Sequence, residues 1–481
     1  MPIADFQPVI GLEVHAQLLT RSKLFCGCPT AFGAPPNSHV CPVCLGMPGV
    51  LPSLNAQVVR FAVRTGLALG CSVRETSIFS RKNYFYPDLP KGYQITQFDR
   101  PICEGGGLVV DGVAGALHVR LNRIHIEEDA GKSVHDAHAG RSLVDLNRAG
   151  VPLLEIVSEP DLRCAEDAAE YLKALREVLL YLGVNDGNLE EGSFRCDANV
   201  SVMPKGSATF GQRVELKNLN SFRYVRQAID YEIARQVDLI ESGEAIVQET
   251  RLFDPSRGET RAMRSKEDAH DYRYFPEPDL PPLHVTPSLV EEERAALPEL
   301  PRARRARLVS QYGIADETAR VLTGERPLAD YFEATAALTK DARRAANWCQ
   351  GELLRLLNET ATPLSALKVS PAQLAALLEL VESGALNQNA AKDVLGEMVR
   401  SGRDAAELVA ALGLGQVNDE AAVLAVVDQV LAAQSSEVEK YRAGQQKVYG
   451  FLVGQVMKAM KGKGNPQLVN RLLKERLEST G

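Results

Sequence analysis

An acid and a histidine lie two residues apart near the N-terminus. Glu13 and His15 belong to the segment 9–18, in which apolar and polar side chains alternate. This alternation predicts a β-strand, from which the two side chains project on the same polar face, about 6 to 7 Å apart at their Cα atoms. A carboxylate and an imidazole at that spacing can share a divalent cation, or one can act on a substrate proton while the other orients it. The alternative is the solvated face of an edge strand.

A run of three acids at 127–129 forms a second polar group. Adjacent carboxylates are costly unless water, a cation or nearby bases neutralise them. The run leads into 131–133, which resembles the end of a phosphate-binding P-loop, but Ile126 stands where that motif requires glycine, so we reject it. Lys132 can still act on a phosphate as a point charge, and the alternative is a solvated surface lysine.

Glu155 is the one acid in the apolar segment 153–157. A carboxylate in a buried strand is very costly without a cation or a basic partner, so we expect a site residue here, with a buried salt bridge as the alternative. Two further segments, 194–201 and 213–217, each alternate an apolar face with a densely charged face. A sheet face with acids for a metal and bases for phosphates favours phosphoryl transfer; a solvated sheet with cross-strand ion pairs is the competing interpretation.

Four cysteines form two close pairs, Cys26 with Cys28 and Cys41 with Cys44, separated by twelve residues. This arrangement predicts a tetrahedral zinc site, although the first pair is tighter than the usual spacing. Coordination by four thiolates is closed, so the metal would be structural rather than catalytic. The chain has nine cysteines and no export signal, which argues against a disulfide framework, and we expect the other five to be small buried residues.

The elements that must position these residues change in character along the chain. Up to about residue 290, short alternating segments with glycine, proline and aromatic residues indicate strands joined by structured loops. Prolines at 278–287 break this texture, and alanine, leucine, glutamate and arginine with helical spacing follow. A second break lies at 413–415, before three helical stretches. We therefore expect an α+β protein with domains at 1–290, 291–408 and 409–481.

Bulk composition narrows the function class. The chain has 481 residues, 45% of them apolar and 24% charged, and no apolar run long enough to cross a bilayer. Its N-terminus resembles no targeting segment, so we expect a cytoplasmic protein with no membrane partner. A net charge of −8 argues against a general nucleic-acid coat but leaves room for a confined basic patch.

Nine segments spread over nearly the whole chain match a known pattern: 11–15 (GLEVH), 80–87 (SRKNYFYP), 126–132 (IEEDAGK), 145–152 (DLNRAGVP), 195–199 (RCDAN), 215–221 (ELKNLNS), 271–276 (DYRYFP), 450–455 (GFLVGQ) and 465–469 (NPQLV). In these segments the sequence resembles the GatB family of the GatCAB tRNA-dependent amidotransferases.

The resemblance implies a cradle-shaped catalytic domain with a mixed or antiparallel sheet, an all-α helical domain and a small all-α tail of the YqeY type that contacts tRNA. It also implies a reaction: the side-chain carboxylate of Glu or Asp misacylated on tRNA(Gln) or tRNA(Asn) attacks the γ-phosphate of ATP, and ammonia displaces the acyl phosphate. The family draws ammonia from the glutaminase subunit GatA, with GatC as the third subunit. No Gly-x-Ser-x-Gly elbow occurs in this chain, in keeping with that division.

By resemblance, magnesium ligands fall on Glu13, His15, Glu155 and one of Glu127 and Glu128. Period-two alternation groups Glu127 with His125 and Glu128 with Ile126, so the choice depends on which face of the strand is polar. We place Glu128 in the catalytic set with Glu13, His15 and Glu155. The candidates for neutralising the phosphates of ATP are Arg81, Lys82 and Lys132.

The tail carries a group of bases in an otherwise acidic protein, and the resemblance makes them candidates for tRNA backbone contacts, with an ordinary solvated helix face as the alternative. They are Lys447, Lys458, Lys461, Lys463, Arg471, Lys474 and Arg476. Two other functions stay open: a zinc-stabilised tRNA-binding scaffold without chemistry of its own, and a free-standing ATP-dependent ligase. Which misacylated tRNA is the physiological substrate stays open as well.

Overall fold

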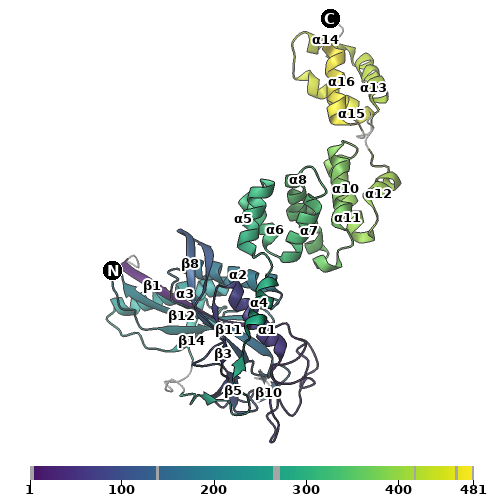
Figure 1. Ribbon diagram of the computed structural model, residues 1–481. Coiled ribbons are helices and arrows are strands. Elements are labelled where there is room, and N and C mark those ends of the chain that lie inside the picture. Colours follow the sequence, from purple (N-terminus) through teal and green to yellow (C-terminus); the bar gives the residue numbers. More distant parts are fainter. Residues whose placement is uncertain (1–4, 137–139, 264–270, 416–418, 461–463, 479–481) are drawn as a thin grey trace. The chain divides into compact units, whose positions relative to one another are not determined.

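The computed structural model describes the chain except residues 1–4, 137–139, 264–270, 416–418, 461–463 and 479–481 (Figure 1). It divides into two compact units, Met1–Leu300 and Pro301–Gly481, which we describe separately. The first unit is built on a mixed sheet and the second is helical, which confirms the α+β class expected from the sequence.

A large sheet forms the centre of the first unit. Its pairs are antiparallel except for the parallel pair β13–β14, and β1 lies between β11 and β12. Across the sheet the strands are β15 (Glu259–Ala262), β14 (Thr250–Asp254), β13 (Val214–Lys217), β12 (Phe194–Pro204), β1 (Phe6–Gln17), β11 (Pro152–Ser158), β8 (Gly115–Glu128), β6 (Cys103–Glu104) and β2 (Ser72–Val73), while β7 (Gly107–Gly112) pairs with β8.

Alternation decides which face of the central strand is buried. Leu12, Val14 and Ala16 of β1 are fully buried in the core, while Glu13 and His15 between them are only partly buried. Helices supply the other side of that core (Figure 1): α1 (Ala56–Ala68), α2 (Ala165–Leu182), α3 (Phe222–Glu241) and α4 (Pro287–Ala295). The apolar face of the sheet is thus covered by helices, and the polar face is left for the site.

Three small sheets also occur among the described residues of the first unit. They are β9 (Lys132–Asp136) with β10 (Arg141–Asp145), the three-stranded β16 (Phe275–Pro276), β4 (Ser80–Asn83) and β5 (Tyr93–Thr96), and β17 (Leu283–His284) with β3 (Thr76–Ser77). Arg60 and Arg64 of α1 form ion pairs with Glu293 of α4 at 2.8 Å, so these two helices pack together within the first unit.

In the second unit the described residues form two apolar cores, one between Leu308 and Leu408 and one between Val423 and Leu477. Around the first lie α5 (Pro301–Tyr312), α6 (Asp316–Thr323), α7 (Arg326–Ala336), α8 (Ala342–Asn347), the π-helical turn η2 (Trp348–Leu353), α9 (Leu354–Glu359), the 3-10 turn η3 (Leu364–Ala366), α10 (Pro371–Glu382), α11 (Gln388–Ser401) and α12 (Ala405–Leu412). Around the second lie α13 (Glu420–Ala433), α14 (Ser435–Arg442), α15 (Val448–Ala459) and α16 (Pro466–Glu478). The three-domain division stays a prediction.

No single helix among the described residues is long and apolar enough to span a bilayer. The pair α13 and α14 reaches the length and composition only when taken together, and it bends by 89°.

Candidate metal and phosphate site

The strand register brings three of the expected residues together. His15 of β1 lies opposite Glu155 of β11, and Glu155 lies opposite His125 of β8. Glu127, two residues further along β8, projects from the same face as His125. A chain segment that ends at residue 17 therefore meets segments more than a hundred residues downstream, in one row across the polar face.

The side chains of this row converge on a small space. Nε2 of His15 lies 3.5 Å from Oε2 of Glu155 and 3.7 Å from Oε1 of Glu127. One ligand atom from each of the three residues lies within 4.8 Å of the others. Glu127 is 3% exposed and Glu155 8%, so the two carboxylates are withdrawn from water next to each other. Two carboxylates and one imidazole fit a magnesium ion that keeps its remaining positions for water and phosphate oxygens.

The pKa shifts of His15 and Glu155 reflect the negative charge of the neighbouring carboxylates and the positive charge of the neighbouring imidazoles. Burial opposes the charged form of His15, but its hydrogen bond to Glu155 and the charges of Glu155 and Glu127 prevail and raise the pKa of His15. Burial likewise opposes the carboxylate of Glu155, but the charge of His125 prevails and lowers the pKa of Glu155 well below its ordinary value. The two imidazoles thus compensate charge that a bound cation would otherwise compensate.

Glu128 lies apart from this row. It follows Ile126 on the other side of β8, where its carboxylate pairs with Lys91 and accepts a hydrogen bond from the backbone N–H of Ile95 at 2.9 Å. Of the two acids left open by the alternation, Glu127 is therefore the one that the structure places beside His15 and Glu155.

Glu13 lies on the same face as His15 but one step along β1. Its carboxylate accepts a hydrogen bond from Nδ2 of Asn199 at 2.9 Å. Burial raises the pKa of Glu13, and the negative charges of Glu155 and Glu215 raise it further. Glu13 is close enough to feel the charge of Glu155 but does not belong to the group of three.

His125 was not among the site residues expected from the sequence. It is 4% exposed, and its Nε2 lies 3.2 Å from Glu155 and 3.8 Å from Glu127. Burial opposes the charge of His125, but the carboxylates of Glu155 and Glu127 prevail and raise the pKa of His125 to about 9, so at neutral pH both ring nitrogens carry hydrogen. His125 can then donate to the carboxylates from behind. The alternation that groups it with Glu127 was the signal that could have identified it.

The three expected phosphate ligands lie in different surroundings. Burial opposes the charge of Lys82, but the carboxylate of Glu127 prevails and raises the pKa of Lys82, whose Nζ lies 4.8 Å from the ring centre of Tyr272. Arg81, next to it on β4, forms two hydrogen bonds with Glu277 at 2.7 and 2.8 Å. Lys132 is exposed on β9. Of these three bases, Lys82 is thus the one whose charge acts on Glu127.

Further bases extend the polar face toward β13. Arg195 of β12 lies opposite His15 in the register and pairs with the buried Asp129 at 3.1 Å. Lys217 of β13 pairs with Asp197 of β12 at 2.8 Å and with Glu215 at 3.0 Å. The charged faces expected at 194–201 and 213–217 therefore form cross-strand ion pairs, as the competing interpretation held, and they also border the acidic row.

The four cysteines meet in one cluster, and their Sγ atoms lie within 4.8 Å of one another. The Sγ atoms of Cys41 and Cys44 are 3.9 Å apart, close to the separation of roughly 3.8 Å that tetrahedral zinc with bonds of about 2.3 Å requires. A hydrogen bond from Cys26 is the largest cause that lowers the pKa of Cys44, to about 4, and the ammonium of Lys23 contributes. The donor set and its spacing fit zinc.

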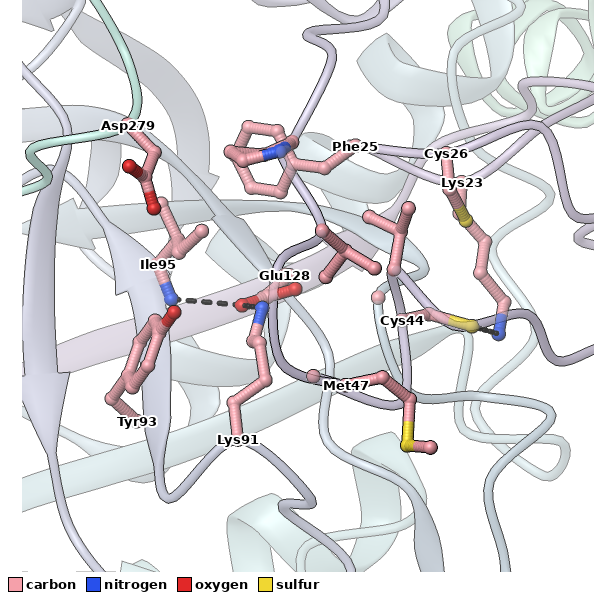
Figure 2. A pocket seen from close by; sticks show the side chains of 15 residues that line it. Lys23, Phe25, Cys26, Cys44, Met47, Lys91, Tyr93, Ile95, Glu128 and Asp279 are labelled. Atoms are coloured by element: carbon pink, nitrogen blue, oxygen red, sulfur yellow. Dashed lines mark hydrogen bonds and ion pairs between the residues drawn. The ribbon is translucent and has the colours of Figure 1, made fainter.

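A cavity of about 90 Å³ separates the cysteines from the strand end that carries Glu128 (Figure 2). Cys26, Cys44 and Lys23 line one side, and Lys91, Tyr93 and Glu128 line another. Figure 2 shows the Lys23 side chain reaching the sulfur of Cys44 and the Glu128 carboxylate reaching the backbone nitrogen of Ile95.

The tail bases differ in their surroundings. Lys447 and Lys458 are exposed at the two ends of α15. Arg471 pairs with Glu420 at 2.9 Å, Lys474 with Glu478 at 4.0 Å, and Arg476 with Asp428 at 3.0 Å. Lys461 and Lys463 lie outside the described residues.

Comparison with known proteins gives matches over nearly the whole chain. A family model described as the GatB/GatE catalytic domain matches residues 8–291, and one described as the GatB domain matches residues 330–477. A Myxococcus xanthus protein named as the B component of an aspartyl/glutamyl-tRNA(Asn/Gln) amidotransferase is 69% identical over 477 residues, which are 99% of this chain and 100% of that protein. A protein of the same name from Geobacter sulfurreducens is 56% identical over 477 residues, 98% of this chain and 100% of that protein.

Proposed function

This chain belongs to the GatB/GatE family of tRNA-dependent amidotransferase components, and we propose that it activates the side-chain carboxyl of Glu or Asp misacylated on tRNA with ATP and then amidates it. The products are Gln-tRNA(Gln) or Asn-tRNA(Asn). The chain is a carbon–nitrogen ligase component that works with a glutaminase subunit, GatA, and with GatC in a cytoplasmic heterotrimer.

One observation carries the proposal: His15, Glu127 and Glu155 bring two buried carboxylates and an imidazole within 4.8 Å of one another on the polar face of the sheet. We assign these three as magnesium ligands and place Glu13 and Glu128 outside the set. Magnesium bound there would neutralise phosphate charge, which is the main requirement of phosphoryl transfer. Lys82, whose charge already interacts with Glu127, is our first candidate for the phosphates of ATP.

The reaction then needs no nucleophile from this chain. The substrate carboxylate forms a bond to the γ-phosphorus of ATP, the bond from that phosphorus to the β-phosphate oxygen breaks, and ADP leaves. Ammonia forms a bond to the acyl carbon and gives up one proton to the solvent, and inorganic phosphate leaves with the electron pair of the broken carbon–oxygen bond. The cluster and the bases that border it act by positioning and by charge.

Two further assignments belong to the proposal. We propose a structural zinc ion in the cluster of Cys26, Cys28, Cys41 and Cys44, since its donor set and spacing fit that metal. We also propose that the tail contacts the tRNA backbone. Lys447 and Lys458, exposed at the two ends of α15, are better candidates for these contacts than Arg471 and Arg476 of α16, whose charges are already paired with acids.

Substitution of the cluster in the reconstituted three-subunit enzyme tests the reaction. Glu127→Gln and Glu155→Gln keep the shape of the side chain and remove its charge. We expect ATP hydrolysis dependent on misacylated tRNA and amidation of that tRNA to fall by at least a hundredfold, while tRNA binding and glutaminase activity persist. Glu244→Gln, at an exposed acid of the same unit, is the matched control.

Amidation at the normal rate in both cluster variants would refute the assignment. If the unmodified complex showed no tRNA-dependent ATP hydrolysis at all, the scaffold function would replace the one proposed. Supplying Glu-tRNA(Gln) and Asp-tRNA(Asn) separately in the same assay identifies the substrate.

A further inference from the structure

Lys23 is a fully buried lysine beside the cysteine cluster. Its exposed fraction is 0%, and its Nζ has three acceptors: the carbonyl oxygen of His39 at 2.7 Å, that of Leu146 at 3.3 Å and the Sγ of Cys44 at 3.6 Å. An ammonium has three hydrogens, so these contacts use its donor capacity in full. The side chain is therefore fixed against Cys44, as Figure 2 shows.

The charge of Lys23 requires a partner. A fully buried ammonium is very costly without a nearby anion, and two of its three acceptors are neutral carbonyl groups. The two acids that line the neighbouring cavity have other cations, since Glu128 pairs with Lys91 and Asp279 with Arg81 at 3.3 Å. Among the contacts of Lys23 in the described part of the chain, only the sulfur can carry negative charge.

A metal ion bound in the cluster would supply that charge. Zinc held by four thiolates has a net charge of −2, and Cys44, the thiolate that Lys23 contacts, is buried. A hydrogen bond from an ammonium to one thiolate reduces this charge and orients the ligand, as groups behind metal ligands generally do. With zinc bound, the positive charge of Lys23 and the negative charge of the metal–thiolate centre would each offset the free-energy cost of burying the other.

We propose that Lys23 is the counter-cation of the four-cysteine zinc centre and that its hydrogen bond to Sγ of Cys44 slows loss of zinc. The inference rests on the proposed zinc site and goes beyond it, because it assigns a residue outside the cysteine pattern.

The same ammonium joins the cysteine loop to the catalytic sheet. Leu146 belongs to the segment that leads into β11, and Arg148 of that segment donates to the carbonyl oxygens of Ala130 and Gly131 beyond β8. A backbone hydrogen bond of 2.9 Å from Leu24 to Gly150 lies next to Lys23. Zinc retention and the order of this segment should therefore change together.

Replacement of the charge at constant side-chain length tests the proposal on the full chain. Lys23→Met removes the ammonium, and Lys205→Met, at an exposed lysine of the same unit, is the control. The measurements are zinc content, the rate of zinc release to a colorimetric chelator and the thiolate-to-metal absorption band of the cobalt-loaded chain. We expect Lys23→Met to release zinc at least tenfold faster with a shifted cobalt band, and Lys205→Met to match the unmodified chain.

A measurement on the unmodified chain covers the case in which Lys23→Met does not fold. Reductive methylation read by mass spectrometry should leave Lys23 unmodified while zinc is bound and modify it after a chelator has removed the metal. Equal zinc release from the folded variant and the unmodified chain, or methylation of Lys23 independent of zinc, would overturn the role of Lys23 alone. A chain that binds neither zinc nor cobalt through four thiolates would overturn the zinc site itself.

Discussion

His125 offers the sharpest test of how the acidic row works, because the sequence resemblance did not include it. We expect His125→Asn to weaken divalent cation binding and His125→Gln to retain much of it. The glutamine amide nitrogen reaches about as far as Nε2 of histidine and can still donate to Glu155, whereas that of asparagine stops near the position of Nδ1.

The size of the effect follows from the contacts of Glu155. Nε2 of His125, 4% exposed, lies 3.2 Å from its carboxylate, and a hydrogen bond to a charged group contributes about 1.5–3 kcal/mol. Glu155 keeps His15 at 3.5 Å and Arg123 at 3.9 Å, so the lower end of that range applies. About 1.5 kcal/mol corresponds to roughly tenfold weaker binding, in line with the effect of groups behind metal ligands.

The assay is a titration of the full chain with Mn²⁺, a stand-in for Mg²⁺, followed by electron paramagnetic resonance of the free ion. The magnesium dependence of amidation by the complex should shift by the same factor at unchanged tRNA affinity. His118→Asn is the control, because His118 is an exposed histidine of the same strand. Equal affinity in His125→Asn and the unmodified chain would refute the role of His125, and an equal loss in the Asn and Gln variants would show that the ring acts by packing alone.

Two further predictions concern other parts of the chain. Lys82→Met should raise the KM for ATP about tenfold and leave that for tRNA unchanged, as steady-state kinetics would measure, because its ammonium carries charge next to Glu127; an unchanged KM for ATP argues against phosphate contact. In the helical part, Glu333→Gln should lower the midpoint of thermal unfolding at pH 7 by several degrees, since Arg304 and Arg307 hold that carboxylate at 2.8 and 2.6 Å. Burial opposes the charge of Glu333, but the two arginines prevail and lower the pKa of its carboxyl. The stabilising effect of the carboxylate is therefore complete above the pKa of the unfolded chain, about 4.5, and is lost as the pH falls through the lower pKa of the folded chain. A difference in unfolding midpoint between Glu333→Gln and the unmodified chain that persists at pH 3 contradicts this account.

The sequence was informative where a pattern is local. Alternation in 9–18 predicted which face of β1 is buried, and the spacing of the cysteines predicted a cluster that the structure assembles. The family and the α+β class also followed from the sequence. Local patterns could not choose between Glu127 and Glu128. The choice depends on which of these two side chains projects from the polar face of the sheet, and that is fixed by the pairing of β8 with β11.

The remaining features depend on contacts between distant segments. The sequence around Arg81 gives no sign of an ion pair. Its bidentate partner, Glu277, lies 196 residues away in the chain. Nothing in the sequence around Lys23 indicates that its side chain is buried. Only the folded chain shows that it is fully buried next to Cys44. The assignments of Arg81 and Lys132 to phosphate stay predictions.

The position of β1 in the sheet has a consequence for biosynthesis. This strand ends at Gln17, yet the strands on its two sides begin at Pro152 and Phe194. During translation β1 stays unpaired, with its apolar side chains exposed, until most of the first unit has left the ribosome. An unpaired strand can associate with other chains during this interval. We therefore expect nascent chains truncated before Phe194 to bind a chaperone that recognises exposed apolar segments, and longer chains to be released from it.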